Sequence, residues 1–184
     1  MGRLKHETAL HIFVISAALL ATRLLYLASP AGRIGDADEA VFGLMAQKIE
    51  ALEEFPIYCW QAHYAGAVVS YVAAAIFHFA GSSFVALRSA MLPVALLIPI
   101  LLYFVYRRMF GPGEALVGAL FTIFCPFFIL HYTMAAYGGY GESLLGTALI
   151  ILLSWHLRPD VEGGWASWLC LVLGLVCGFF FYVL

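Results

Sequence analysis

Five long apolar runs dominate the sequence, and they restrict the fold more than any other feature. Each run is 15 to 20 residues long and carries at most one Lys, Arg, Asp or Glu. A membrane-spanning helix needs about 20 predominantly apolar residues, with a range of about 17–25. We therefore expect an all-α integral membrane protein, a polytopic helical bundle. The predicted spans cover about residues 9–28, 89–106, 115–132, 143–157 and 165–184.

The overall composition supports a membrane protein and argues against several other classes. Of the 184 residues, 64% are hydrophobic and 11% are charged, which is too apolar for so short a chain to bury in a soluble core. The net charge of −2 provides no basic surface, so we expect no nucleic acid partner. No Cys/His pair has zinc-binding spacing, so we expect no resident cofactor, and the lipid bilayer is the expected environment.

Residues 64–80 decide the predicted topology. As a helix this 17-residue segment is about 25 Å long, shorter than a hydrocarbon core of about 30 Å. If it lies on the membrane, five basic residues are cytoplasmic and three are outside, whereas a spanning segment reverses this bias. We predict a multi-pass cell-membrane protein with a cytoplasmic N-terminus, whose outer loop 29–88 shares a face with residues 133–142. The five basic residues are Arg3, Lys5, Arg107, Arg108 and Arg158; the three are Arg33, Lys48 and Arg88.

The predicted outer loop is acidic and contains an amphipathic pattern. Residues 29–62 carry two basic and six acidic side chains, and apolar residues recur at helical spacing within residues 36–54. We predict a helix there on the membrane surface, which with the segment 64–80 makes two juxtamembrane helices on the outer face. Its predicted apolar face consists of Val41, Leu44, Met45, Ile49 and Leu52.

The start of this amphipathic helix permits two interpretations. Asp36 and Glu39 have capping-box spacing, so Asp36, Asp38 and Glu39 have a purely structural explanation as helix-capping residues. In the functional interpretation, Asp38 accepts a proton from an attacking hydroxyl. Glu39 then provides a second acceptor or holds a divalent cation.

Several motifs together resemble a known enzyme superfamily. Asp38-Glu39 opens an amphipathic helix just outside the first span, and it is followed by FPIYCWQAHYAG, then LRSAMLPVALLIPILLYFVYRRMFGPGEALVGALFTIFCPFF and AAYGGYGESLLGTALIILL. In order, spacing and sidedness, these motifs resemble the GT-C superfamily of polytopic glycosyltransferases, which includes protein O-mannosyltransferases and aminoarabinose transferases. The resemblance covers roughly residues 9–157.

This resemblance implies a reaction and a set of site residues. Such enzymes take a sugar from a polyprenyl-phosphate carrier at the outer leaflet and pass it, with inversion, to a hydroxyl or amine of a lipid, glycan or protein acceptor. By resemblance, Asp38 is the base, Glu39 supports it, and Glu142 occupies the second outer acidic position. Family members are some two to three times longer, so residues 1–184 are expected to be the N-terminal part of a single transmembrane domain. The Pro-Pro of many members is replaced here by His63-Tyr64-Ala65-Gly66.

Further substrate-binding candidates each have a structural alternative. The Arg88 guanidinium is a candidate to bind the lipid phosphate bidentately, or else it snorkels to the interface. His63 is a second candidate for contact with that phosphate. Glu142 begins a span, where the helix dipole alone would stabilise a carboxylate. Tyr137 and Tyr140 either stack on a sugar or lie in the aromatic belt.

Two other classes of function stay open at this point: a transporter, and a non-catalytic lipid-binding membrane subunit. Transporters usually place ionisable groups near the membrane midplane. The acidic residues here lie at the edges of the predicted spans, and Arg23 is the only basic residue within one. This distribution favours chemistry at the membrane interface over translocation.

Overall fold

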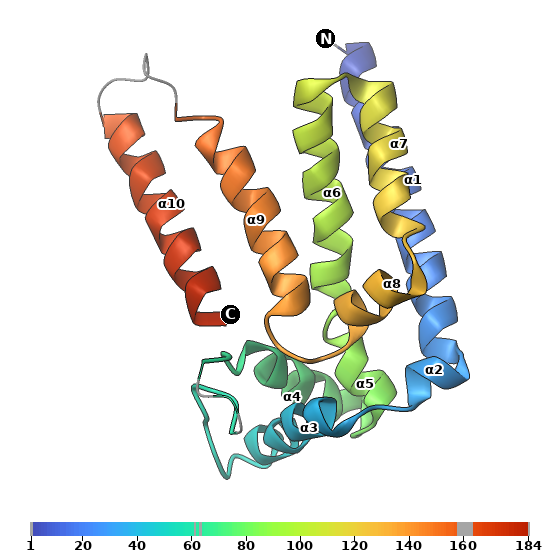
Figure 1. The fold of residues 1–184 in the computed structure, drawn as a ribbon, viewed down its shortest axis with the longest axis vertical. Coiled ribbons are helices and arrows are strands. Elements are labelled where there is room, and N and C mark those ends of the chain that lie inside the picture. The colour runs from blue at the N-terminus through green and yellow to red at the C-terminus, as the bar shows by residue number, and fades with distance from the viewer. Residues whose placement is uncertain (1, 61, 63, 158–163, 184) are drawn as a thin grey trace.

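The computed structural model describes residues 2–60, 62, 64–157 and 164–183, and within these ranges every regular element is an α-helix. The chain forms a bundle with a smaller cap of helices at one end (Figure 1). This confirms the all-α prediction. The helices are α1 (Gly2–Ala28), α2 (Pro30–Arg33), α3 (Ala37–Glu50), α4 (Val68–Ala80), α5 (Phe84–Ser89), α6 (Leu92–Met109), α7 (Pro112–Ile123), α8 (Phe127–Met134), α9 (Tyr140–Ser154) and α10 (Gly164–Val183).

The bundle consists of α1, α6, α7, α9 and α10, which run side by side along the long axis (Figure 1). Two of its segments, His6–Ala28 and Phe84–Met109, are long and apolar enough to cross a membrane. The pair α7 and α8 makes a third if it forms one broken span. The helix α9 and the apolar part of α10 are shorter, so the five-span arrangement stays a prediction.

The span predicted at 115–132 is not a single helix. In the structure α7 ends at Ile123, α8 begins at Phe127, and the two helices meet at an angle of 80°. Pro126 explains the break, because it has no backbone N–H to donate and it disfavours helical geometry at the residue before it. Its own backbone is extended, with φ −51° and ψ 148°.

The helices α2 to α5 and the segment 135–139 gather at one end of the bundle, with α3 and α4 lying across the ends of the long helices (Figure 1). The buried face of α3 packs mainly on α4, and the Ser70 hydroxyl donates to the Phe42 carbonyl oxygen at 3.0 Å. The predicted amphipathic helix is therefore present, but protein covers most of its apolar face. Leu44 and Leu52, predicted for that face, are exposed, and the helix ends at Glu50 rather than at 54.

Candidate functional site

Asp36 caps the N-terminus of α3, as its spacing predicts. Its Oδ1 accepts a hydrogen bond from the Glu39 backbone N–H at 3.0 Å, and the Tyr137 hydroxyl donates to its Oδ2. Burial alone would raise the pKa of Asp36, but these hydrogen bonds outweigh it and lower the pKa below its usual value. Asp36 is therefore a fixed, ionised cap with both carboxylate oxygens engaged.

The second half of the predicted capping box does not form, because the Glu39 side chain turns into the protein and pairs with Arg88. The Arg88 Nε donates to Glu39 Oε1 at 2.8 Å, and Nη2 donates to Oε2 at 2.5 Å. Both residues have no solvent exposure. The Ala136 N–H donates to Glu39 Oε1 at 3.1 Å, so the carboxylate also holds the segment that leads to α9.

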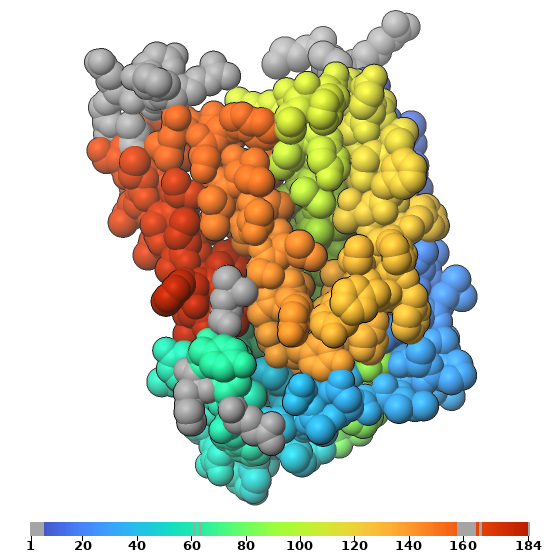
Figure 2. Space-filling view, in the orientation of Figure 1, coloured from blue at the N-terminus to red at the C-terminus, as the bar shows by residue number. Residues whose placement is uncertain are grey.

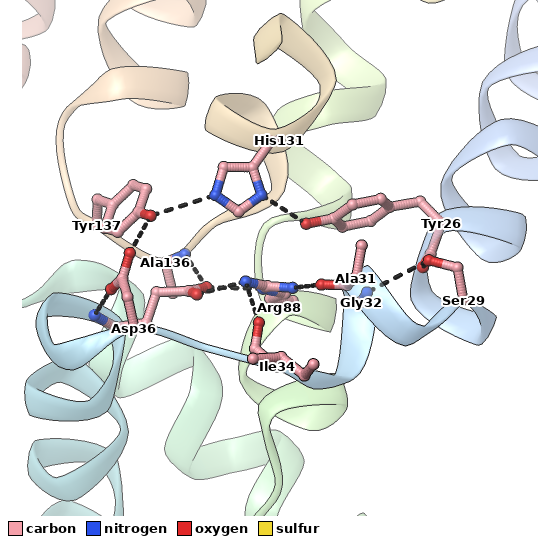
Figure 3. Close-up of polar contacts among 11 residues, drawn as sticks. Tyr26, Ser29, Ala31, Gly32, Ile34, Asp36, Arg88, His131, Ala136 and Tyr137 are labelled. Atoms are coloured by element: carbon pink, nitrogen blue, oxygen red, sulfur yellow. Dashed lines mark hydrogen bonds and ion pairs between the residues drawn. The ribbon is translucent and has the colours of Figure 1, made fainter. Parts of the chain in front are cut away.

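The remaining donors of Arg88 tie this pair to the chain between α1 and α3. Its Nη1 donates to the Ala31 carbonyl at 2.5 Å and its Nη2 to the Ile34 carbonyl at 3.1 Å (Figure 3). All three guanidinium nitrogens therefore donate to protein acceptors. Lipid phosphate binding by Arg88 stays a prediction, and in this arrangement a phosphate would have to displace Glu39 or a carbonyl.

A second hydrogen-bonded chain runs above this ion pair and joins α3 to α8 and α1 (Figure 3). The Tyr137 hydroxyl lies 3.2 Å from His131 Nε2, and His131 Nδ1 lies 2.8 Å from the Tyr26 hydroxyl. The Tyr26 ring also lies 5.6 Å from the Arg88 guanidinium, a cation–π distance that links the two networks. Neither Tyr26 nor His131 was identified as a site residue from the sequence, because no short-range spacing pairs residues 105 positions apart.

A cavity of about 720 Å³ lies beside these networks, between α3 and the start of α9. In the space-filling view, the chain entering α9 lies directly on the start of α3 (Figure 2). The described residues that line the cavity include Asp36, Asp38 and four tyrosines, but neither Arg88 nor Glu39. The four tyrosines are Tyr64, Tyr132, Tyr137 and Tyr140.

Two glycines shape the turn between Tyr137 and Tyr140, two of the tyrosines that line the cavity. Gly138 and Gly139 have φ values of 65° and 96°, which side chains with a Cβ rarely adopt. A Cβ on Gly138 would also lie 2.8 Å from the Phe42 ring. The turn therefore needs glycine, and both Tyr137 and Tyr140 line the cavity.

Three other predicted site residues, Glu39, Arg88 and Glu142, are not among the described residues that line the cavity. Glu142 is buried, and its Oε2 accepts from the Gly139 N–H at 3.1 Å, which makes it a cap of α9. This geometry matches the structural alternative for Glu142. His63 lies outside the described residues. Among the residues that the structure does describe, no cluster of three His, Cys, Asp or Glu is close enough to hold a metal ion.

One carboxylate differs from all the others at this site. Asp36, Glu39 and Glu142 each accept hydrogen bonds that fix their orientation. Asp38 is exposed and lines the cavity, and its carboxylate has no hydrogen-bonding partner within the described ranges. A carboxylate in this state is free to accept a proton from a bound ligand.

No protein-family model, no curated protein and no solved structure matches this chain.

Proposed function

We propose that the protein is a membrane glycosyltransferase of the GT-C type, which transfers a sugar from a polyprenyl-phosphate carrier to an acceptor at the outer membrane face. The observation that carries this proposal is the exposed carboxylate of Asp38, which has no hydrogen-bonding partner among the described residues, in a tyrosine-lined cavity at one end of an apolar helical bundle. The cavity volume lies in the usual range of about 300–1,000 Å³ for small-molecule sites. A sugar bound there would lie beside the bilayer that holds its lipid carrier.

In the proposed reaction, the Asp38 carboxylate removes the proton from the acceptor hydroxyl or amine as that group attacks the anomeric carbon. The bond between the anomeric carbon and the phosphate oxygen breaks on the opposite face, and the polyprenyl phosphate leaves with the electron pair. Configuration at the anomeric carbon is therefore inverted. Glu39, held by Arg88, supports the base by fixing the first turn of α3.

The proposed topology has five crossings, with α7 and α8 forming one broken span. The N-terminus and the α6–α7 turn are cytoplasmic, and the cavity faces outward, in keeping with the bias of basic residues. Cysteine labelling tests this in a variant whose four native cysteines are replaced. A cysteine at Ser82 should react from outside and one at Gly113 only from the cytoplasm. Labelling of both positions from one side would reject the proposed topology.

The test of function is the substitution Asp38→Asn in the full-length protein, reconstituted in liposomes with a polyprenyl-phospho-sugar. Asparagine is nearly isosteric but cannot take the proton, so transfer should fall about 10²–10⁴-fold. The matched control is Glu54→Gln, which changes an exposed acid outside the cavity lining to its amide and should transfer normally. Transfer by Asp38→Asn at the normal rate would remove Asp38 as the base.

A transporter is the second candidate, and one structural feature favours it. The break between α7 and α8 lies next to buried Arg23, whose Nη1 is 3.5 Å from the Ile123 carbonyl oxygen. Discontinuous helices and intramembrane charges form the substrate sites of many transporters. Solute flux that depends on Arg23, without sugar transfer by the same preparation, would favour this class.

A further inference from the structure

Among the described residues that line the cavity beside α3, the charge is negative and no Lys or Arg compensates it. Two of its described lining residues, Asp36 and Asp38, are carboxylates, and none is Lys or Arg. Arg88 does not offset them at the cavity surface, because it is buried and its charge is compensated by Glu39. An anionic substituent on a bound sugar or acceptor would therefore be repelled by this lining, and a cationic one attracted.

One of the two carboxylates stays charged under ordinary conditions. The hydrogen bonds from Tyr137 and from the Glu39 N–H lower the pKa of Asp36 and fix its carboxylate beside the cavity. The lining therefore holds a permanent negative charge at neutral pH, in addition to the unpaired carboxylate of Asp38.

Another part of the lining is a wall of three tyrosines, Tyr132, Tyr137 and Tyr140, and Tyr137 is hydrogen-bonded to Asp36. The Tyr132 ring lies 5.1 Å from Tyr140 and 5.7 Å from Tyr137, and Tyr137 lies 5.9 Å from Tyr140. The rings of Tyr132 and Tyr140 are inclined at 77°, and those of Tyr137 and Tyr140 at 76°, so neighbouring rings of the wall meet edge to face. Aromatic faces attract ammonium cations through the ring quadrupole, and carboxylates add direct charge attraction.

We infer that this cavity binds an ammonium group through the tyrosine wall and the carboxylates of Asp36 and Asp38. This deepens the proposed function and rests on it, because it assigns an amine to one of the two substrates. The amine belongs either to the transferred sugar or to an acceptor such as an ethanolamine lipid headgroup. Both sources present the same ammonium chemistry to the cavity.

Binding tests this inference without requiring turnover. The protein is placed in phosphatidylglycerol nanodiscs and titrated with glucosamine, glucose and glucuronate, which share a ring but carry charges of +1, 0 and −1. Empty nanodiscs provide the background. We expect glucosamine to bind at least 10-fold more tightly than glucose, and glucuronate to bind more weakly than both. Equal affinities, or preference for glucuronate, would overturn the inference.

Variants assign the binding to the named residues. Asp38→Asn should reduce the preference for glucosamine over glucose about 5-fold or more, and Glu54→Gln should leave it unchanged. Tyr140→Leu should weaken glucosamine binding about 2–5-fold, whereas Tyr140→Phe keeps the ring and should bind normally. If Asp38→Asn and Tyr140→Leu both keep the full preference, the ammonium site is not in this cavity.

Two further measurements distinguish the two possible sources of the ammonium group, and distinguish this inference from the proposed function. In one, half of the phosphatidylglycerol is replaced by phosphatidylethanolamine. If the ammonium group comes from a lipid headgroup, the phosphatidylethanolamine should compete with glucosamine for the cavity. If it comes from the sugar, the affinity for glucosamine should stay the same. Ammonium binding with no sugar transfer from any polyprenyl-phosphate donor would retain this inference and reject the proposed function. Sugar transfer with no charge preference in binding or turnover would retain the proposed function and reject this inference.

Discussion

Two regions of the molecule each bury one arginine, and they differ in how far they compensate its charge. At the end of the bundle, Arg88 makes a bidentate pair with Glu39 and donates to two carbonyls. Between α1 and α7, Arg23 is 3% exposed, its Nη1 is 3.5 Å from one carbonyl, and its Nε has no partner among the described residues. The charge of Arg88 is therefore balanced by a buried carboxylate, whereas no described carboxylate balances the charge of Arg23.

The largest expected effect comes from breaking the first of these arrangements. Arg88→Met leaves the Glu39 carboxylate buried without its counter-ion, and breaking a buried ion pair costs about 3–5 kcal/mol. We expect the free energy of unfolding in detergent to fall by that amount. Denaturant titration followed by circular dichroism measures it.

A double substitution shows whether this cost reflects the pair or the packing. Arg88→Met with Glu39→Met replaces both charges by apolar side chains, which is often close to neutral for buried pairs. We expect the double variant to recover most of the lost stability. A double variant as unstable as the sum of the two single ones would mean that Arg88 and Glu39 act independently, against the observed geometry.

The next effect concerns the hydrogen-bonded chain above the ion pair. Tyr137→Phe keeps the ring in the cavity wall but removes the hydroxyl that joins Asp36 to His131. We expect a loss of about 1–1.5 kcal/mol at neutral pH, typical of one hydrogen-bonding group. The same denaturant titration measures it, and an unchanged stability would show that the chain contributes little to holding α3.

The same variant has a defined pH signature. Because the folded state lowers the pKa of Asp36, its contribution is fully present above the usual value of about 3.8 and is lost as pH falls through the lower folded-state value. Tyr137→Phe removes one of the interactions that lower this pKa. Less stability then depends on the ionisation of Asp36, so we expect the variant to lose less on acidification than the parent protein. A larger acid loss in the variant would contradict this role.

Local sequence signals were sufficient for much of the fold. The apolar runs predicted where long helices form, and the spacing of Asp36 and Glu39 predicted the N-terminus of α3 within a residue. The break before Pro126 was missed because proline inside an apolar run is compatible with either a kink or a full break. Only the packing of α7 and α8 decides between them.

The site was predictable only in part, for a related reason. The sequence and its resemblance named Asp38, Tyr137 and Tyr140 among the candidates, and all three line the cavity. It could not show that Glu39 turns inward, because its partner Arg88 is 49 residues away. The pairing of Tyr26 with His131 is likewise a product of tertiary structure, which a single sequence does not record.

The second arginine should respond to the same substitution with the opposite sign. Arg23→Met removes a charge that no described acid compensates, while it retains a flexible apolar side chain of similar reach. A charged residue at the centre of a spanning helix costs about 2.5–3.5 kcal/mol, but Arg23 lies only about 7.5 Å from the end of α1. We therefore expect a stabilisation of about 1 kcal/mol by the same titration. A loss of 2 kcal/mol or more would show that Arg23 has a counter-ion comparable to that of Arg88.

The smallest effect tests whether the stability of the end region depends only on buried charge or also on local helix geometry. The C-terminus of α3 ends in a Schellman arrangement, in which the Glu53 N–H donates to the Lys48 carbonyl at 2.9 Å and the Leu52 N–H to the Ile49 carbonyl at 3.0 Å. Leu52 has φ 57° there and is 74% exposed, so its side chain adds strain and little packing.

Leu52→Gly should relieve that strain and raise the free energy of unfolding by about 0.5–1 kcal/mol. Leu52→Ala is the control, because it removes the same exposed side chain but retains the Cβ, and it should not stabilise. Leu52 lies 13 residues beyond Glu39, or about 20 Å along the helix, so the gain should add to the cost of Arg88→Met within about 0.5 kcal/mol. If Leu52→Gly destabilises the protein, the exposed leucine makes a contact that outweighs its backbone strain. The C-terminus of α3 would then be stabilised by a side-chain contact in addition to its capping hydrogen bonds.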